Sequence, residues 1–182
     1  MLTTIKTNER KILKRGFLML GGWLLVVNAC WAGEAATTAS AGSNGSRTGS
    51  ASASASYTGD GRGFAQTSTR SGPVSVGRGI AYGVDRDGIT FSASHAVASR
   101  FGPAVASSLN ITIGRDGSVA HSTGLSIAGG DRTRVANAGG FAANHRGSGA
   151  TAGATAGGHT GVRGRVQAMT DSRSLPPWRL RR

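Results

Sequence analysis

Large apolar and small residues alternate along the middle of the chain, from about residue 64 to residue 142. At most of the alternate positions the residue is Val, Ile, Leu, Phe or Tyr. The positions between them are mostly Gly, Ala, Ser or Thr. Arg78 is an exception within the first run. The clearest runs cover residues 74–84, 89–97, 105–113 and 119–127. A period of two is typical of a β-strand whose two faces meet different surroundings.

Groups of turn-forming residues interrupt these runs every 14 or 15 residues. They lie at residues 71–73, 86–88, 101–103, 115–117 and 129–131. Two of the groups contain Asp-Gly, which is a strong hairpin signal, and we expect type I′ turns there. The pattern predicts about five strands of roughly 8–10 residues. These strands would form an antiparallel meander or, alternatively, the coils of a β-solenoid.

The two faces of the predicted strands differ in chemistry. One face carries Val, Ile, Leu and Phe, and a single sheet cannot leave such a face in water. We therefore expect the sheet to fold over on itself, to pair with another copy, or to lie on a partner. The other face carries Gly, Ala, Ser and Thr, which permit the close approach of a second sheet.

Low-complexity segments flank this predicted core. We interpret residues 33–63 as a flexible linker, because they offer little apolar surface to bury. Residues 143–182 are Gly/Ala-rich and then basic, and Pro176-Pro177 excludes a continuous helix near their end. The expected fold is therefore mainly β, with a small antiparallel meander or β-solenoid core at about 64–142 between disordered Gly/Ala/Ser/Thr-rich flanks.

The N-terminus has the pattern of a secretory signal peptide over residues 1–32. Basic residues precede an apolar run at residues 16–27, which is too short to span a bilayer comfortably. Cleavage after Ala32 fits ordinary signal peptidase. The residues before Cys30, the single cysteine, instead resemble a lipobox, in which that cysteine would be lipidated. We expect export to the periplasm, the cell surface or the medium, without disulfides and with a membrane link only through such an anchor.

Composition argues against an enzyme. Gly, Ala, Ser and Thr make up about half of the 182 residues and aromatic residues only 5%, so the chain lacks the large side chains of an ordinary α/β enzyme core. No nucleophile elbow or His-Glu zinc motif occurs, and without lysine beyond residue 32 a phosphate-binding loop is excluded. We therefore predict no catalytic residue, no cofactor and no small-molecule substrate.

Candidate metal ligands are few. His95 and His121 fall on the large-residue face of neighbouring predicted hairpins, where two imidazoles and a carboxylate could hold a metal ion. No third ligand lies at a suggestive spacing, so we predict no metal site. Asp85, Asp87 and Asp116 stand beside arginines at predicted turns, and we assign them to turn formation.

The exported chain would be strongly basic. From Gly33 onward it contains sixteen Arg, no Lys and seven acidic residues, a net charge of +9. Guanidinium groups bind phosphate, sulfate and carboxylate through paired hydrogen bonds. The candidate anion-binding residues are Arg163, Arg165, Arg173, Arg179, Arg181 and Arg182.

Two functions remain open at this stage. The first is an exported, non-enzymatic bacterial structural or interaction protein of the cell surface or matrix, self-associating through its β-sheet. The second is an Arg-based module for an anionic polymer such as lipopolysaccharide, acidic polysaccharide or extracellular DNA. Salt separates them, because it weakens phosphate binding steeply and does not weaken sheet stacking.

Overall fold

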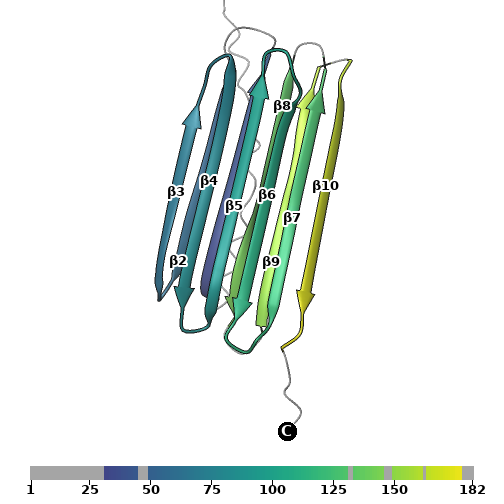
Figure 1. The fold of residues 1–182 in the computed structure, drawn as a ribbon. Coiled ribbons are helices and arrows are strands. Elements are labelled where there is room, and N and C mark those ends of the chain that lie inside the picture. The colour runs from purple at the N-terminus through teal and green to yellow at the C-terminus, as the bar shows by residue number, and fades with distance from the viewer. Residues whose placement is uncertain (1–30, 45–48, 131–132, 146–148, 162, 178–182) are drawn as a thin grey trace, which may run out of the picture.

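The computed structural model describes residues 31–44, 49–130, 133–161 and 163–177, which form ten strands and no helix. Two antiparallel sheets lie face to face as a sandwich (Figure 1). The four-stranded sheet has the order β2 (Ser50–Gly59), β1 (Trp31–Ser43), β8 (Arg134–His145) and β9 (Gly149–Thr160). The six-stranded sheet has the order β10 (Arg165–Leu175), β7 (Val119–Gly129), β6 (Ala104–Gly114), β5 (Gly88–Ser99), β4 (Val74–Asp85) and β3 (Arg62–Arg70). The mainly β, antiparallel fold expected from the sequence is confirmed.

Strands β3 to β7 form the meander that the alternation predicts. Each strand pairs with the next along the chain, and the predicted turn groups fall at the strand ends. The registers are continuous across the sheet: Tyr82 pairs with Phe91, which pairs with Ile111. Large residues therefore line up on one side of the sheet and small residues on the other.

The hairpin between β4 and β5 differs from the expected type I′ turn. A type I′ turn needs positive φ at both central residues, and neither Arg86 nor Asp87 has one. Asp85 instead accepts hydrogen bonds from the N–H groups of Asp87 and Gly88, at 2.8 and 2.9 Å. Asp at the first position and Gly at the fourth are typical of a type I turn. Gly88, with φ of 149°, adopts a backbone conformation that other residues rarely take.

The structure corrects the expectation for the low-complexity flanks. Residues 33–63, interpreted as a linker, form most of β1, all of β2 and the start of β3, while residues 143–161 complete β8 and form β9. Part of the predicted basic tail forms β10, which pairs with β7 from Arg165 to Leu175. Small residues cannot build a separate core, but here their strands cover the small-residue face of the meander, where most of the side chains are small.

Small side chains fill the space between the sheets. Among the described residues every buried hydrophobic side chain is an alanine, and the largest fully buried side chains are Asn110 and Asn144. Ser108 Oγ donates across the gap to the Gly139 carbonyl at 2.9 Å. A serine can reach the facing backbone only if the sheets stand closer than the roughly 10 Å of ordinary sandwiches. The interior is therefore thin and partly polar.

Glycines mark the closest contacts between the sheets. A Cβ at Gly79 would lie 2.5 Å from the Ser54 carbonyl oxygen of the facing sheet. Gly63 and Gly83 instead make room for the Tyr57 ring, which a Cβ at either position would overlap. Burial, followed by the nearby charge of Asp85, raises the pKa of the Tyr57 hydroxyl. The low-complexity strand β2 thus supplies a large side chain to an interior that is otherwise small.

A buried cation joins the two sheets at the opposite end from Asp85. Arg134 on β8 donates to the carbonyl oxygens of Gly130 and Arg100, at 2.8 and 2.6 Å, and to that of Ser99 at 3.4 Å. These backbone acceptors offset part of the cost of burying the guanidinium group, which is 6% exposed.

Candidate functional site

The outward side of the six-stranded sheet presents the large residues of the meander to solvent. We call it the open face, and the strand register places its side chains in five complete rows that cross the strands, followed by an incomplete sixth row of Val74, Ser99, Gly129 and Arg165. From the Asp85 end, and in the order β3, β4, β5, β6, β7, β10, the first row is Arg62, Val84, Ile89, Ile113, Val119 and Leu175; the second is Phe64, Tyr82, Phe91, Ile111, His121 and Arg173; the third is Gln66, Ile80, Ala93, Leu109, Thr123 and Asp171; the fourth is Ser68, Arg78, His95, Ser107, Leu125 and Met169; the fifth is Arg70, Val76, Val97, Val105, Ile127 and Gln167.

Large side chains of the open face are substantially exposed. Leu109 is 41% exposed and Ile113 is 44% exposed, whereas the inward-facing Asn110 and Thr112 between them are 0% exposed. Scattered apolar residues are ordinary on protein surfaces, but a contiguous apolar face marks an interaction site. The open face is therefore the candidate functional surface.

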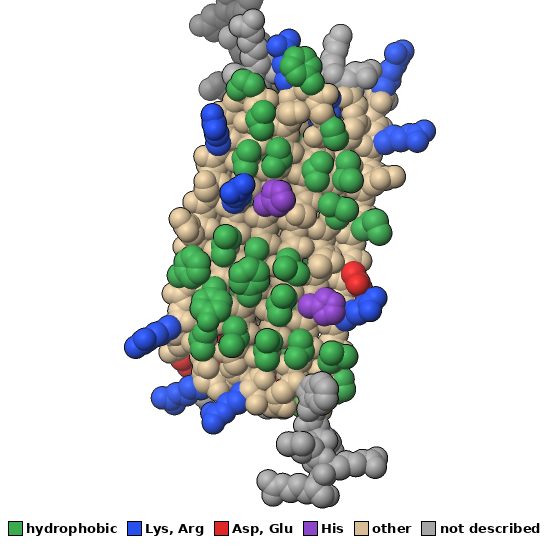
Figure 2. All heavy atoms as spheres, in the orientation of Figure 1, with side chains coloured by type: hydrophobic (Ala, Val, Ile, Leu, Met, Phe, Trp, Pro, Cys, Tyr) green, Lys and Arg blue, Asp and Glu red, His purple; other side chains and the backbone are tan. Residues whose placement is uncertain are grey.

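The five rows differ in chemistry. On the four central strands the first and fifth rows are entirely aliphatic, and the second row carries three aromatic rings on β3 to β5. The fourth row is polar on β3 to β6, with Arg78, His95 and Ser107 side by side on β4, β5 and β6. Figure 2 shows the result as bands of apolar side chains with a cation and a histidine between them.

A shallow hollow lies where the third and fourth rows carry small and polar side chains. It has a volume of ≈ 230 Å³, and its lining includes Arg78, Ala93, His95 and Ser107. Ser107 Oγ and His95 Nδ1 form a hydrogen bond of 3.2 Å across the two strands. Because the neighbouring second row carries larger side chains such as Phe91, the open face has an aromatic ridge beside a polar hollow.

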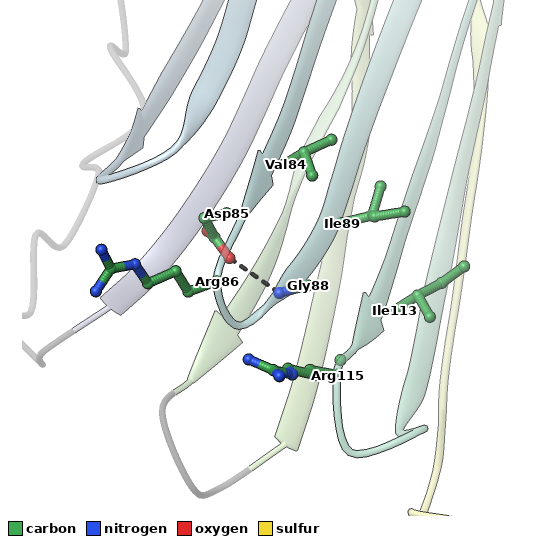
Figure 3. A pocket seen from close by; sticks show the side chains of 8 residues that line it. Val84, Asp85, Arg86, Gly88, Ile89, Ile113 and Arg115 are labelled. Carbon is green, nitrogen blue, oxygen red and sulfur yellow. Dashed lines mark hydrogen bonds between the residues drawn. The ribbon is translucent and has the colours of Figure 1, made fainter.

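A second hollow of ≈ 410 Å³ lies at the turn end of the sheet. In Figure 3, Val84, Ile89 and Ile113 point to one side of it, and Arg86 and Arg115 point to the other. The cations and the apolar side chains therefore do not converge on one ligand. This hollow continues the first row of the open face and is not a separate binding site.

Aspartates beside this hollow serve the turns. Asp116 accepts hydrogen bonds from the Ser118 N–H at 2.9 Å and from the Ser118 hydroxyl at 2.5 Å. The hydroxyl bond and then the backbone bond lower the pKa of Asp116. The carboxylate is thereby held in its charged form as an acceptor, which fits turn formation.

The two histidines of the predicted large-residue face lie on the open face but are not neighbours. His95 is in the fourth row on β5, and His121 is in the second row on β7, between Ile111 and Arg173. Within the described residues, no group of three His, Cys, Asp or Glu side chains is placed to hold a metal ion.

The predicted anion-binding arginines do not form one cluster where the structure describes them. Arg163 lies in the turn before β10, and Arg165 and Arg173 stand on β10, roughly 26 Å apart at the usual rise of a strand. Arg173 forms an exposed ion pair with Asp171 at 3.3 Å. The remaining candidates lie outside the described residues: Arg179, Arg181, Arg182 and the lipidation candidate Cys30.

The outward side of the four-stranded sheet contrasts with the open face. Its β1 and β2 positions carry mostly Ala, Ser and Thr, and Thr38 Oγ1 and Ser54 Oγ are hydrogen-bonded at 2.8 Å. On β9 Thr155 is exposed, and Phe141 of β8 lies over Gly153. This side offers a polar, matched control for experiments on the open face.

The predicted cleavage site falls within β1, two residues after its start, and cleavage there would remove Trp31, which pairs with His145 of β8. Pairing of β1 with β2 begins at Gly33, so cleavage after Ala32 would leave that ladder whole. In the described ranges there is no helix of the length and apolar character needed to cross a membrane.

Sequence reasoning missed the importance of Arg78. It noted this residue only as a break in the alternation, although a cation at a position that should be large and apolar is itself a signal. The strand register was needed to show that Arg78 stands beside His95 and that the two begin a polar row.

Comparison of the chain with known protein families, with curated proteins and with solved structures finds no match.

Proposed function

We propose that this chain is an exported, non-enzymatic structural or interaction protein of a bacterial cell surface or matrix, and that it acts through the open face. The observation that carries this proposal is the exposure of five rows of largely apolar side chains on a sandwich whose interior is already filled. Apolar surface left in water costs about 25 cal/mol per Å². A partner surface that covers the open face is therefore strongly favoured.

The closed interior supports a role without catalysis. Ser92 Oγ donates to Asn110 Oδ1 at 2.6 Å, and Asn110 Nδ2 donates to Ser122 Oγ at 3.1 Å. All three side chains are 0% exposed. These hydroxyl and amide groups are engaged with each other, and a substrate has no path to them.

The alternative function is an Arg-based module for an anionic polymer. The exposed arginines on the edge strands favour it, since Arg62 and Arg70 stand on β3 and Arg165 and Arg173 on β10. Such binding would weaken steeply as salt is added, whereas contacts through the open face would persist.

The test is retention of the exported protein on the cell. We expect wild-type protein in the surface or matrix fraction after a wash with molar NaCl, with an N-terminus after Ala32 or a lipidated Cys30 by mass spectrometry. Ile111→Asp places a charge on the open face and should shift the protein into the medium while its circular dichroism stays unchanged. The matched control Thr155→Asp, on the opposite outer face, should remain in place.

Three results would contradict the proposal. Equal retention of Ile111→Asp and Thr155→Asp would show that the open face makes no contact. Release of the wild type by the salt wash would favour the anionic polymer. Recovery of an intact chain with Met1 from the cytoplasm would exclude export.

A further inference from the structure

We propose that the open face binds a second copy of this chain, with the strands of the two copies antiparallel and a two-fold axis running along the third row. This inference rests on the proposed function and adds to it the identity and the orientation of the partner. Such an interface is isologous, because the same surface of both copies takes part.

An axis along the third row places the first row of one copy over the fifth row of the other. These are the two rows that are entirely aliphatic on the central strands. Val84 then faces Val76 of the second copy, and Ile89 faces Val97. The same relation brings Ile113 over Val105 and Val119 over Ile127. Both ends of the interface are thus closed by apolar contacts.

The same axis places the aromatic second row over the polar fourth row. Tyr82 of one copy faces Arg78 of the other, and Phe91 faces His95. A guanidinium group is attracted to the face of an aromatic ring, most strongly where water is excluded. Ile111 likewise faces Ser107. The second row of one copy therefore lies over the hollow of ≈ 230 Å³ that Arg78, His95 and Ser107 line in the other. Charge and shape are therefore both self-complementary.

The size of the open face suits such a dimer. Six strands spaced about 4.8 Å apart and five rows spaced about 6.8 Å apart cover roughly 650 Å² between their outermost positions, and roughly 980 Å² when the full width of the outer strands and rows is included. A stable protein–protein interface of standard size buries roughly 800 Å² per partner.

Other occupants fit the open face less well. With parallel strands, Arg78 would face Leu125 and Tyr82 would face His121, which buries the guanidinium group without a partner. An anionic lipid surface would attract the edge arginines, but the row of Arg78, His95 and Ser107 lies in the middle of the face and would be pressed into the apolar layer. Only the antiparallel pair gives Arg78 an aromatic partner.

Repulsion between like charges at the rim is the main electrostatic cost of this arrangement. On β10, Asp171 lies on the axis and faces Asp171 of the other copy, although each is exposed and paired with Arg173 of its own chain. Arg62 of one copy lies over Arg70 of the other, and both are exposed at the rim on β3. Salt screens such exposed charges. We therefore expect dimerisation to strengthen as NaCl is raised, which is opposite to the behaviour of a polyanion-binding surface.

Thiol cross-linking tests the orientation, using the exported chain in a Cys30→Ser background and a short bis-maleimide. Thr123→Cys lies on the proposed axis, so its thiols should cross-link two copies efficiently. Val119→Cys should fail to cross-link with itself, because its two thiols would be roughly 27 Å apart. A mixture of Val119→Cys and Ile127→Cys chains should cross-link.

Each other outcome of this experiment overturns the inference. Efficient cross-linking of Val119→Cys with Val84→Cys would indicate parallel strands. A dimer in sedimentation that none of these thiols cross-links would place the interface elsewhere. A monomer that floats with anionic phospholipid vesicles would identify a lipid surface as the occupant. If the chain is monomeric and Ile111→Asp is still released from the cell, self-pairing fails while the proposed function stands.

A double-mutant cycle tests the contact between Arg78 and Tyr82. These residues lie four positions apart on β4, roughly 13 Å, so they cannot touch within one copy. Arg78→Ala and Tyr82→Leu should each raise the dimer dissociation constant about tenfold, and the double variant should raise it little further. Independent, multiplicative effects would show that the two side chains do not meet across the interface.

Discussion

The two sides of strand β6 show that this protein reverses the usual relation between residue size and burial. On the inward side Asn110 and Thr112 are fully buried, and on the outward side Leu109 and Ile113 are more than 40% exposed. Successive residues of this one strand point alternately to the two sides. Hydrophobicity alone would place the leucine and the isoleucine inside.

Sheet separation explains the reversal. The Thr112 hydroxyl donates to Asn144 Oδ1 at 2.6 Å, and the Ser126 hydroxyl donates to the Gly157 carbonyl of the facing sheet. These short bridges exist only because the sheets stand close together, and leucine or isoleucine would not fit in so thin a layer. Polar groups that form such bridges are tolerated inside because they are hydrogen-bonded. Thr90 Oγ1, Ser94 Oγ and Asn144 Nδ2 are buried without a partner. The large residues are left outside, where a second surface can cover them.

The largest effect is expected from adding bulk to the inward side. Gly79→Val should lower the free energy of unfolding by about 3 kcal/mol or more, because its Cβ would press on the Ser54 carbonyl and separate the sheets. Urea denaturation followed by circular dichroism measures this. The control is Gly129→Ala, whose Cβ would meet nothing within 4 Å. A Gly79→Val chain as stable as the control would disprove the close approach of the sheets.

A pair of neighbouring substitutions sharpens the contrast between the two sides. Thr112→Asp should cost about 3 kcal/mol of stability, because it places a carboxylate in the fully buried layer. Ile111→Asp should cost about 1 kcal/mol in the monomer, because this side chain borders solvent. Both are measured by urea denaturation at a protein concentration below the dimer dissociation constant. The opposite ranking would mean that the large residues form the core.

The smallest effect on stability is expected at the turn between β6 and β7, which contains Asp116. The pKa of Asp116 is lowered in the folded chain, so its stabilising contribution is present above its ordinary value near 3.8 and is lost as the pH falls through the lowered value. Asp116→Asn keeps an acceptor for Ser118 but does not titrate. We expect the fall of Tm between pH 5 and pH 2 to be slightly shallower in this variant. A fall identical to that of the wild type would assign the acid sensitivity to other groups.

The meander was predictable because its signals are local. Alternation fixes which residues share a face, and the groups at 86–88 and 115–117 set the strand lengths and hence the register. The second sheet was not predictable in the same way. Its Ala-Ser strands carry too little apolar surface to identify them as part of a core, and their stability depends on contacts with a distant part of the chain. The turn type was also missed, since Asp85 acts from the first position of the turn and not from its centre.

The sequence by itself determined two unlike faces, evenly spaced turns and a lysine-free positive charge after residue 32. It left open what would cover each face, because a large apolar face and a small close-packing face can each be buried. Only the tertiary structure decided this: β1, β2, β8 and β9 cover the small face, and their own small residues bring the sheets too close together for large side chains. The register then placed Arg78 beside His95, with no large apolar side chain paired to it on a neighbouring strand. This arrangement arises from the pairing of strands and cannot be seen in the sequence of any one strand.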